Sequence, residues 1–554
     1  MVPRLVIRLI ALLTVAFTLQ ACGGSGNSSS SSSAGAGAMN VSLVDAPGDY
    51  DHVWVTVKDI WFHTDANAGT TDSGWLKFPL NSPMIVDLIA LSNGNVSPNL
   101  WDGIQLPVGI YQQIRLFLVS TDATNPPAGH SHFNEVSIGG NTYSLRIPDP
   151  DDGIALIGTF PVTAGNTRKL AIDIDAGDDV VDFNGSEYIL EPRLSCFDLD
   201  HIGAIVGQLS TGATFTRAPH FVIKAETLSA DGTYHVVRRS TVPDATGKFI
   251  LFPVSAATST TTYDILVRGI GYETMIVKGV PVTQGTTPRS SPTSIPTITM
   301  ITDTDFASSA TITSPTGAWV NFYQTLKSSD TGTSEVPYEV RFRHFNPLTG
   351  SFSGFMLSDG QLQWGLYSSS SITYNAVDPA EGDGGYRAVA GADESLYNSS
   401  GLPVSANISD AEPSLAFGAT LTVISPWSGN SITGVISMLS PTMMDNKFNS
   451  GVVFAVHRGL IVDTISTMIG DLPLSDVSTG GSYTIFNLPG GSTGTPLPSA
   501  IYGVDAIFWS TSTASFEKIM VPNYTAIAIP KIADLSTGDG TANLKMIPLF
   551  FPIW

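Results

Sequence analysis

The sequence contains few charged residues, and few of those are basic. Charged side chains make up 13% of the 554 residues, against about 25% in an average soluble protein. Lys and Arg number 26 while Asp and Glu number 48, which gives a formal net charge of −22. A protein that binds nucleic acid needs a basic face for the phosphates, and the sequence shows none. We therefore expect no nucleic-acid partner.

Cysteines and long apolar runs are also scarce. The two cysteines, Cys22 and Cys196, are too few for a disulfide scaffold or a cysteine-based zinc site. Beyond the first 21 residues, no apolar run reaches the length of about 18 residues that suggests a membrane span. A hydrophobic content of 42% nonetheless excludes wholesale disorder. At ~150 residues per domain, the length suggests about four domains.

The N-terminus has the pattern of an export signal. Arg4 and Arg8 precede an apolar segment over residues 9–19, which is too short to span a bilayer. The letters LQAC at 19–22 resemble the bacterial lipobox, which implies cleavage after residue 21 and acylation of Cys22. An ordinary secretory signal with a chance cysteine is the alternative.

The segment after this signal is rich in Ser and Gly. Residues 22–38 are expected to be the lipidated cysteine and a flexible tether. Gly23 rather than Asp follows Cys22, which by resemblance to Gram-negative lipoproteins implies an outer-membrane anchor, facing the periplasm or the outside. With Cys22 acylated, Cys196 would remain as a free, buried thiol.

The rest of the chain has the pattern of an all-β protein. Short alternating runs such as 53–57 and 170–175 recur between Gly, Pro, Asn and Asp, so we expect an all-β chain of tandem, immunoglobulin-like β-sandwich domains. One short helix is expected over 85–91, just after Pro83. Residues 544–554 are expected to form a buried terminal strand.

Two resemblances refine this prediction. VSLVDAP at 41–47, LPVGIYQQIRL at 106–116 and YILEPRL at 188–194 resemble a bacterial lipoprotein family, domain of unknown function 4382, over residues 40–194. That family has no established activity. GAIVG at 203–207 and DATGKF at 244–249 resemble the carboxypeptidase-regulatory-like, transthyretin-type β-sandwich.

A similar order of segments recurs near the C-terminus, starting with ITGVI at 432–436. The predicted domains are therefore a signal over 1–21, a tether over 22–38, the family domain over 39–198, a regulatory-like sandwich over 199–300, a β-domain of unclear type over 301–429, and a diverged regulatory-like sandwich over 430–554.

Two acidic clusters stand out as candidate metal sites. They consist of Asp149, Asp151 and Asp152, and of Asp173, Asp175, Asp178 and Asp179. Carboxylates at this density could hold calcium, which prefers six to eight oxygen ligands. The alternative is a solvated acidic edge, since the spacing does not match an EF-hand loop.

Four aromatic residues are candidate sugar-stacking positions, namely Trp54, Trp61, Trp364 and Tyr367. Packing in the core is the alternative for each of them. No group of residues has the spacing of a catalytic motif, so we expect a non-enzymatic protein.

The function expected from the sequence is that of a cell-envelope lipoprotein that binds carbohydrate or another envelope component. The alternative is a structural stalk, or an assembly or adhesion partner, without a small ligand.

Overall fold

The computed structural model describes residues 35–46, 48, 50–183, 187–211, 221–256, 261–285, 291–312, 318–327, 336–347, 349–382, 384–391, 397–398, 404–417, 422–423, 425, 427–438, 450–467, 482–509 and 525–549. Strands dominate this part of the chain, which confirms the all-β prediction. The strands form four successive units, which we call unit 1 (36–198), unit 2 (202–299), unit 3 (305–423) and unit 4 (428–549). Within the described residues, no helix has the length and apolarity that crossing a bilayer requires.

Unit 1 contains twelve strands, one short α-helix and one 3-10 helix. They are β1 (Ala36–Ala46), β2 (His52–His63), β3 (Leu76–Asp87), η1 (Ile89–Leu91), β4 (Trp101–Pro107), β5 (Gly109–Leu118), β6 (Glu135–Ile138), β7 (Asn141–Arg146), β8 (Ile154–Val162), β9 (Thr167–Asp175), α1 (Ala176–Asp179), β10 (Val180–Asp182), β11 (Glu187–Leu190) and β12 (Ser195–Asp198).

Unit 2 follows directly, and its described residues form strands without a helix. They are β13 (Ile202–Ser210), β14 (Phe221–Leu228), β15 (His235–Thr241), β16 (Lys248–Ser255), β17 (Thr262–Gly269), β18 (Tyr272–Pro281), β19 (Thr293–Ser294) and β20 (Ile298–Thr299).

Unit 3 comprises β21 (Asp305–Ile312), β22 (Trp319–Thr325), β23 (Pro337–His344), β24 (Ser351–Ser358), β25 (Leu362–Leu366), β26 (Asn375–Val377), β27 (Tyr386–Gly391), β28 (Tyr397–Asn398), β29 (Val404–Ile408), β30 (Ser414–Phe417) and β31 (Thr422–Val423). Unit 4 comprises β32 (Ser428–Met438), β33 (Ser450–His457), β34 (Leu460–Thr467), β35 (Ser482–Gly490), β36 (Ile501–Trp509), β37 (Thr525–Ile529), β38 (Lys531–Asp534), β39 (Gly540–Thr541) and β40 (Leu544–Leu549).

The same strand pairing occurs in all four units. In each unit the first strand pairs antiparallel with one strand and parallel with a strand near the end: β1 with β4 and β9, β13 with β16 and β19, β21 with β24 and β30, and β32 with β35 and β39. The second strand pairs antiparallel with two others in each unit, β2 with β3 and β5, β14 with β15 and β17, β22 with β23 and β27, and β33 with β34 and β36, and β2 pairs with β6 in addition. The chain is therefore a fourfold repeat of one β-topology, including the unit whose type the sequence left open.

Each unit has its own apolar core, because alternate residues of the paired strands point inward. In units 1 to 3 the core lies between separate sheets, whereas in unit 4 a pairing of β37 with β40 joins the strands into one nine-stranded sheet. A close approach of glycine to an aromatic ring recurs in the units that the sequence linked. Gly207 lies against the Phe249 ring in unit 2, and Gly434 lies against the Tyr483 ring in unit 4.

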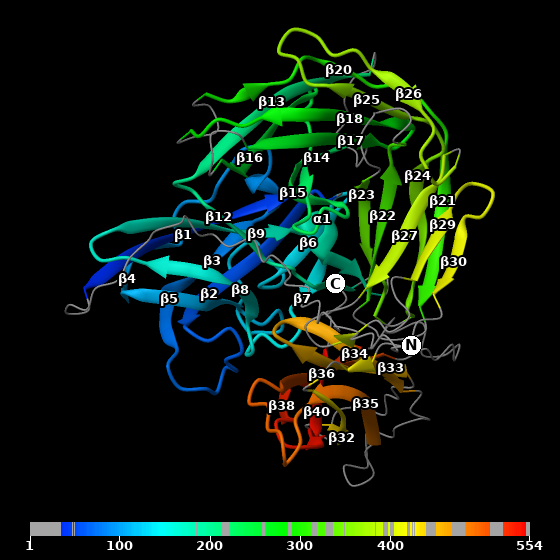
Figure 1. The fold of residues 1–554 in the computed structure, drawn as a ribbon. Helices are drawn as coiled ribbons and strands as arrows, with labels where there is room; N and C mark the ends of the chain where they lie inside the picture. Colours follow the sequence, from blue (N-terminus) through cyan, green and yellow to red (C-terminus); the bar gives the residue numbers. More distant parts are fainter. Residues whose placement is uncertain are drawn as a thin grey trace, which may run out of the picture.

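The units pack around unit 1 rather than in a line. Unit 1 lies beside unit 2, unit 3 and unit 4 at once, with the orange-to-red strands of unit 4 below it and the green strands of units 2 and 3 above and to the right (Figure 1). A small apolar cluster that includes Val44, Phe197 and Phe252 joins units 1 and 2. Another that includes Phe183 and Phe454 joins units 1 and 4.

Three predicted segments differ in the structure. Residues 84–87 belong to β3 because Ile85 and Val86 pair with Thr56 and Val55 of β2, so only η1 remains of the expected helix. The last three residues of the predicted tether, 36–38, are the start of β1 and pair with β4 and β9. Strands β25 and β26 follow the predicted boundary at residue 300, yet they extend the sheet of unit 2 because β25 pairs with β18.

The buried strand predicted for residues 544–554 is present over the part of that segment that the structure describes. Residues 544–549 form β40 between β37 and β32, and residues 550–554 lie outside the described part of the chain. The predicted signal and most of the tether, residues 1–34, lie outside it as well.

Candidate functional site

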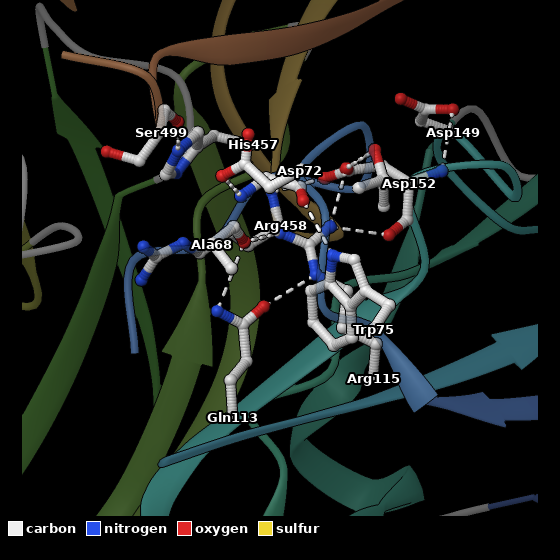
Figure 2. A network of polar contacts seen from close by, with 12 residues as sticks. Ala68, Asp72, Trp75, Gln113, Arg115, Asp149, Asp152, His457, Arg458 and Ser499 are labelled. Atoms are coloured by element: carbon white, nitrogen blue, oxygen red, sulfur yellow. Dashed lines mark hydrogen bonds and ion pairs between the residues drawn. The ribbon is translucent and has the colours of Figure 1, made fainter. Parts of the chain in front are cut away.

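The first acidic cluster lies in the contact between unit 1 and unit 4. Asp152 follows the turn before β8, and its carboxylate accepts hydrogen bonds from Arg115 Nη1 at 2.5 Å and from the backbone N–H of Arg458 at 2.9 Å. Arg115 lies on β5 of unit 1, while Arg458 lies in the β33–β34 hairpin of unit 4. One carboxylate therefore ties the two units together (Figure 2).

The guanidinium of Arg115 is almost wholly buried and its hydrogen bonds are satisfied within unit 1. Besides Asp152, it donates from Nε to Gln113 Oε1 at 2.7 Å and from Nη2 to the Ala68 carbonyl at 3.1 Å. Gln113 in turn donates to the carbonyls of Ala66 and Ala68. Figure 2 shows these groups converging on Arg115 beneath the hairpin of unit 4. A buried charge needs this kind of full compensation to be tolerated.

A second ion pair joins the same two units. Arg146 at the end of β7 donates to Asp505 Oδ2 of β36, from Nη2 at 2.5 Å and from Nε at 3.1 Å. Burial works to lower the pKa of Arg146, but Asp505 and Asp122 outweigh it and raise that pKa. Burial raises the pKa of Asp505, and Arg146 opposes this change.

Asp149 is the most unusual member of the first cluster. Its side chain is buried at the contact with unit 4, its φ is +44°, and its Oδ2 has no hydrogen-bond partner in the structure. Burial, followed by the nearby carboxylates of Asp152 and Asp505, raises its pKa to about 8. Asp149 is thus a neutral acid at pH 7, held against Gly503 of unit 4.

His457 of unit 4 completes this region. Burial, with Arg458 nearby, lowers its pKa to about 3, so the ring is neutral at pH 7. Its Nε2 lies 3.0 Å from the Ser499 carbonyl, which can only accept, so Nε2 carries the proton. At pH 7 both this ring and the Asp149 carboxyl are therefore neutral.

The second acidic cluster lies in the contact between unit 1 and unit 2. Arg239 of β15 donates to Asp173 Oδ1 of β9 at 2.5 Å and to the carbonyl of Asp45 at 2.7 Å. It also donates to the Phe252 carbonyl of its own unit at 3.0 Å. Ser240 adds a hydrogen bond to Asp175 at 3.3 Å. Arg239 is almost fully buried. It links units 1 and 2 in the way that Arg146 links units 1 and 4.

Other members of this cluster shape the chain around α1. The Asp175 carboxylate accepts from the N–H groups of Gly177 and Asp178 and so caps the short helix. Asp179 is buried, and burial raises its pKa to about 8 although Arg193 opposes the shift. These contacts explain why acidic residues gather in this turn.

The contact between unit 1 and unit 3 combines a cation–π contact, with the Arg193 guanidinium carbon 3.6 Å from the centroid of the Phe342 ring, with a pair of neutral side chains. Glu191 Oε2 lies 3.2 Å from His344 Nδ1. Burial raises the pKa of Glu191 to about 8, and burial lowers the pKa of His344 well below its usual value, so both are neutral at pH 7. Asn346 of unit 3 adds hydrogen bonds to the carbonyls of Asp182 and Phe183, at 2.8 and 2.9 Å.

The expectation of a solvated acidic edge is therefore wrong for most of the clustered residues. Asp149, Asp152, Asp173 and Asp179 are buried, because neighbouring units cover the strand faces that carry them. Asp151 alone fits the expectation clearly, with 75% of its side chain exposed and Lys58 at 3.7 Å.

Calcium binding at these clusters stays a prediction. Among the residues that the structure describes, no group of three or more His, Cys, Asp or Glu side chains could hold a metal ion. A cation at Asp152 or Asp173 would have to compete with the arginines that bind these carboxylates.

The candidate stacking residues do not share one surface. Trp54 and Trp61 both lie on the outer face of β2, since a bulge between Val57 and Asp59 shifts the alternation. Trp54 stacks on His52 with centroids 4.4 Å apart, while Trp61 contacts Lys77 and Phe117. Trp364 and Tyr367 pack against the cores of units 3 and 2. Sugar stacking by these residues remains a prediction.

Cys196 is not the free thiol that the sequence suggested. It is buried and disulfide-bonded in the structure. Cys22 lies outside the described residues, so its acylation stays a prediction.

Comparison with known families gives one firm result. Residues 36–192 match the family described as a domain of unknown function, DUF4382. This confirms the resemblance predicted for residues 40–194. The DUF4382 segment is unit 1 almost from end to end, so the family domain is the unit around which the others pack. No curated protein matches the chain.

Solved structures show only weak likeness to the whole chain. The TIE protein of Bacillus anthracis is 9% identical, with 92% of this chain and 73% of that chain covered and a TM-score of 0.13. Two B repeats of the collagen-binding protein of Staphylococcus aureus are 8% identical, with 93% and 99% covered and a TM-score of 0.12. A streptococcal ancillary pilin is 12% identical, with 69% and 98% covered and a TM-score of 0.14. TM-scores this low support no argument about this chain.

The sequence did not predict that Arg115, Arg146 and Arg239 bind carboxylates at the contacts between units. A signal for them was present, because Arg115 interrupts an apolar strand in a chain with only 26 basic residues. Their partners lie up to 359 residues away in the sequence, as Arg146 and Asp505 do, and no local pattern connects such positions.

Proposed function

We propose that this chain is a non-enzymatic protein of the cell envelope, anchored by lipid on Cys22, whose four-unit body binds carbohydrate or another envelope component. The observation that carries the proposal is the packing of units 2, 3 and 4 around the DUF4382 segment (Figure 1). A stalk spans a long distance because its domains lie end to end. Domains packed around a central unit span a much shorter distance. A compact platform close to a lipid anchor suits binding near the membrane surface.

The use of ionisable side chains supports a non-enzymatic role. Arg115, Arg146 and Arg239 are bound to carboxylates inside unit contacts. Asp149 and Glu191, whose pKa values burial raises to about 8, lie in such contacts as well. Perturbed pKa values often mark active sites, but structural ion-pair networks produce them too.

The anchor is tested by mass spectrometry of the N-terminal peptide from the full chain, purified from the membranes of a Gram-negative host. We expect an acylated Cys22 in wild type, and a soluble, unacylated product from Cys22→Ser. An unmodified peptide disulfide-linked to Cys196 would contradict the anchor.

The binding role is tested with the acylated full chain in a detergent that has no sugar headgroup. Neutral and acidic polysaccharides and isolated envelope material are screened with calcium and again with chelator. Binding of any of them supports the proposal, and loss on chelation would additionally support calcium at the acidic clusters. Absence of binding to all of them would overturn the binding role and favour the structural alternative.

A further inference from the structure

A cleft of about 570 Å³ lies between unit 2 and unit 3, away from the acidic clusters. This volume falls in the range of roughly 300–1,000 Å³ typical of small-molecule sites. The lining residues come from four strands of unit 2 and from the β22–β23 region of unit 3: Glu226, Thr227, Leu228, His235, Thr262, Asp264, Lys278, Leu326, Val336 and Tyr338.

The two sides of the cleft differ in polarity. Unit 2 supplies carboxyl, hydroxyl and ammonium groups from Glu226, Thr262, Asp264 and Lys278. Unit 3 supplies the apolar side chains of Leu326 and Val336, and Leu228 at the end of β14 adds a third apolar group that is 52% exposed. A ligand that fits must therefore present one apolar face and one edge rich in hydrogen-bonding groups.

The polar side of the cleft is held in place before any ligand arrives. Asp264 Oδ2 accepts from the Tyr338 hydroxyl at 2.6 Å, and Asp264 Oδ1 accepts from the Gly279 N–H at 2.7 Å. The rings of His235 and Tyr338 stack with centroids 3.7 Å apart and planes 9° apart. Such preorganisation lowers the ordering cost of binding.

Glu226 gives the second, independent observation. Its side chain is fully buried, and its Oε2 accepts from the backbone N–H of Glu339 at 3.1 Å, but its Oε1 has no hydrogen-bond partner. A buried polar atom without a partner is costly, and native structures rarely leave one unexplained. A hydroxyl group of a ligand in the cleft would supply the missing partner.

The charge of the lining is close to balanced. Burial, opposed by Lys224, raises the pKa of Glu226 well above its usual value, which disfavours the charged form of this acid. Asp264 is ionised, because its hydrogen bonds to His235 and Tyr338 outweigh burial and lower its pKa. Lys278 supplies one opposite charge. In a chain with a net charge of −22, this cleft is a nearly neutral surface.

We propose that the cleft between units 2 and 3 binds a sugar residue of a neutral carbohydrate. A pyranose ring has an apolar C–H face for Leu228, Leu326 and Val336, and an edge of hydroxyl groups for Asp264 and Glu226. The assignment rests on the proposed binding function, whose ligand class it specifies.

The test is calorimetric titration of the full chain with cellohexaose, maltohexaose and chitohexaose, in a detergent without a sugar headgroup. Leu228→Trp places a larger side chain at the cleft, and Ile532→Trp is the matched control, because Ile532 is 51% exposed on unit 4. We expect wild type and Ile532→Trp to bind at least one of the three probes, and Leu228→Trp to bind it at least tenfold more weakly. Lys278→Met, which removes the ammonium group, should weaken binding less than Leu228→Trp.

Equal binding by Leu228→Trp and wild type would overturn the assignment of the cleft while leaving the proposed binding function intact. Failure of all three neutral probes, or tighter binding of hexagalacturonate, would overturn the neutral-sugar class. The proposed function fails separately, if the wider screen of polysaccharides and envelope material finds no ligand.

Discussion

Two buried arginines bind carboxylates across the contacts between units. Arg146 of unit 1 binds Asp505 of unit 4, and Arg239 of unit 2 binds Asp173 of unit 1, whereas Arg115 binds Asp152 within unit 1. Because arginine presents several donors in a fixed plane, one side chain can bind a carboxylate and backbone carbonyls of two units at once. Although basic residues are few, some of them therefore help to fix how the units pack.

Replacing Arg239 tests this role at a single residue. In Arg239→Ala, Asp173 stays buried without its cation, and removing one partner of a buried pair costs ~3–5 kcal/mol. We expect a clear drop in the thermal unfolding temperature of the full chain. The control is Lys248→Ala in the same unit, an exposed position that should change stability by no more than ~0.5 kcal/mol. Equal effects of the two changes would contradict the clamping role.

The raised pKa of Asp149 predicts that the free energy of unfolding decreases as pH rises. The pKa of Asp149 is about 8 in the folded chain, against an ordinary value of 3.8. Between these values the folded state holds a proton that the unfolded state has lost, so its contribution to stability falls as pH rises through this window and levels off above about 8. Asp179 and Glu191 add contributions of the same sign.

Asp149→Asn should flatten this dependence, since the amide cannot ionise and asparagine tolerates a positive φ. We expect the variant to be more stable than wild type at pH 8 by on the order of 1–2 kcal/mol, with a smaller difference at pH 5. Denaturation curves at the two pH values measure it. A difference that does not change with pH would contradict the assigned ionisation.

At this scale the sequence reveals which residues are unusual but not what they contact. The acidic clusters were found from their density alone. Their burial was not, because Asp173 and Arg239 are 66 residues apart on different units.

At the scale of elements, the contact between units 1 and 4 uses both a hairpin and a strand of unit 4. The β33–β34 hairpin reaches unit 1 through Arg458, whose carbonyl also accepts from the Ala155 N–H at 3.2 Å. Beside it, β36 approaches Asp149 so closely that a Cβ on residue 503 would lie 1.6 Å from Asp149 Oδ2. Only glycine fits there, so the approach of units 1 and 4 depends on this position.

Gly503→Ala should therefore push unit 4 away from unit 1. We expect faster proteolysis of the full chain between the units and a loss of stability of ~1–3 kcal/mol, as overpacking typically causes. Gly494→Ala is the control, because it is exposed on the same unit with no atom within 4 Å of the added Cβ. Unchanged proteolysis of Gly503→Ala would show that the two units do not approach in this way.

Strand positions were largely predictable from the sequence, because alternation and turn residues act locally. The helix expected over 85–91 failed because pairing of Ile85 and Val86 with β2 outweighs a local start signal. The repeat in unit 3 was not visible for a similar reason. Its strand pairing follows the other units, but the β25–β26 insertion and a different sequence hide the order of the segments.

At the scale of the whole molecule, the buried contacts between units imply a compact body. Apolar clusters and buried ion pairs occur together at the contacts of unit 1 with units 2 and 4, as in a domain core that is shared between neighbours. Interdomain contacts built only from exposed polar groups would allow the units to move independently. The DUF4382 segment is consequently a structural centre, and variants at its contacts should affect all four units.

Small-angle X-ray scattering of the full chain tests this central claim most directly. Size scaling predicts a radius of gyration of about 24 Å for a compact chain of this length, and roughly 40 Å for four units placed end to end. We predict a value within a few ångströms of the compact figure, allowing for the N-terminal segment. A value near the extended figure would contradict both the clamped arrangement and the binding platform built on it.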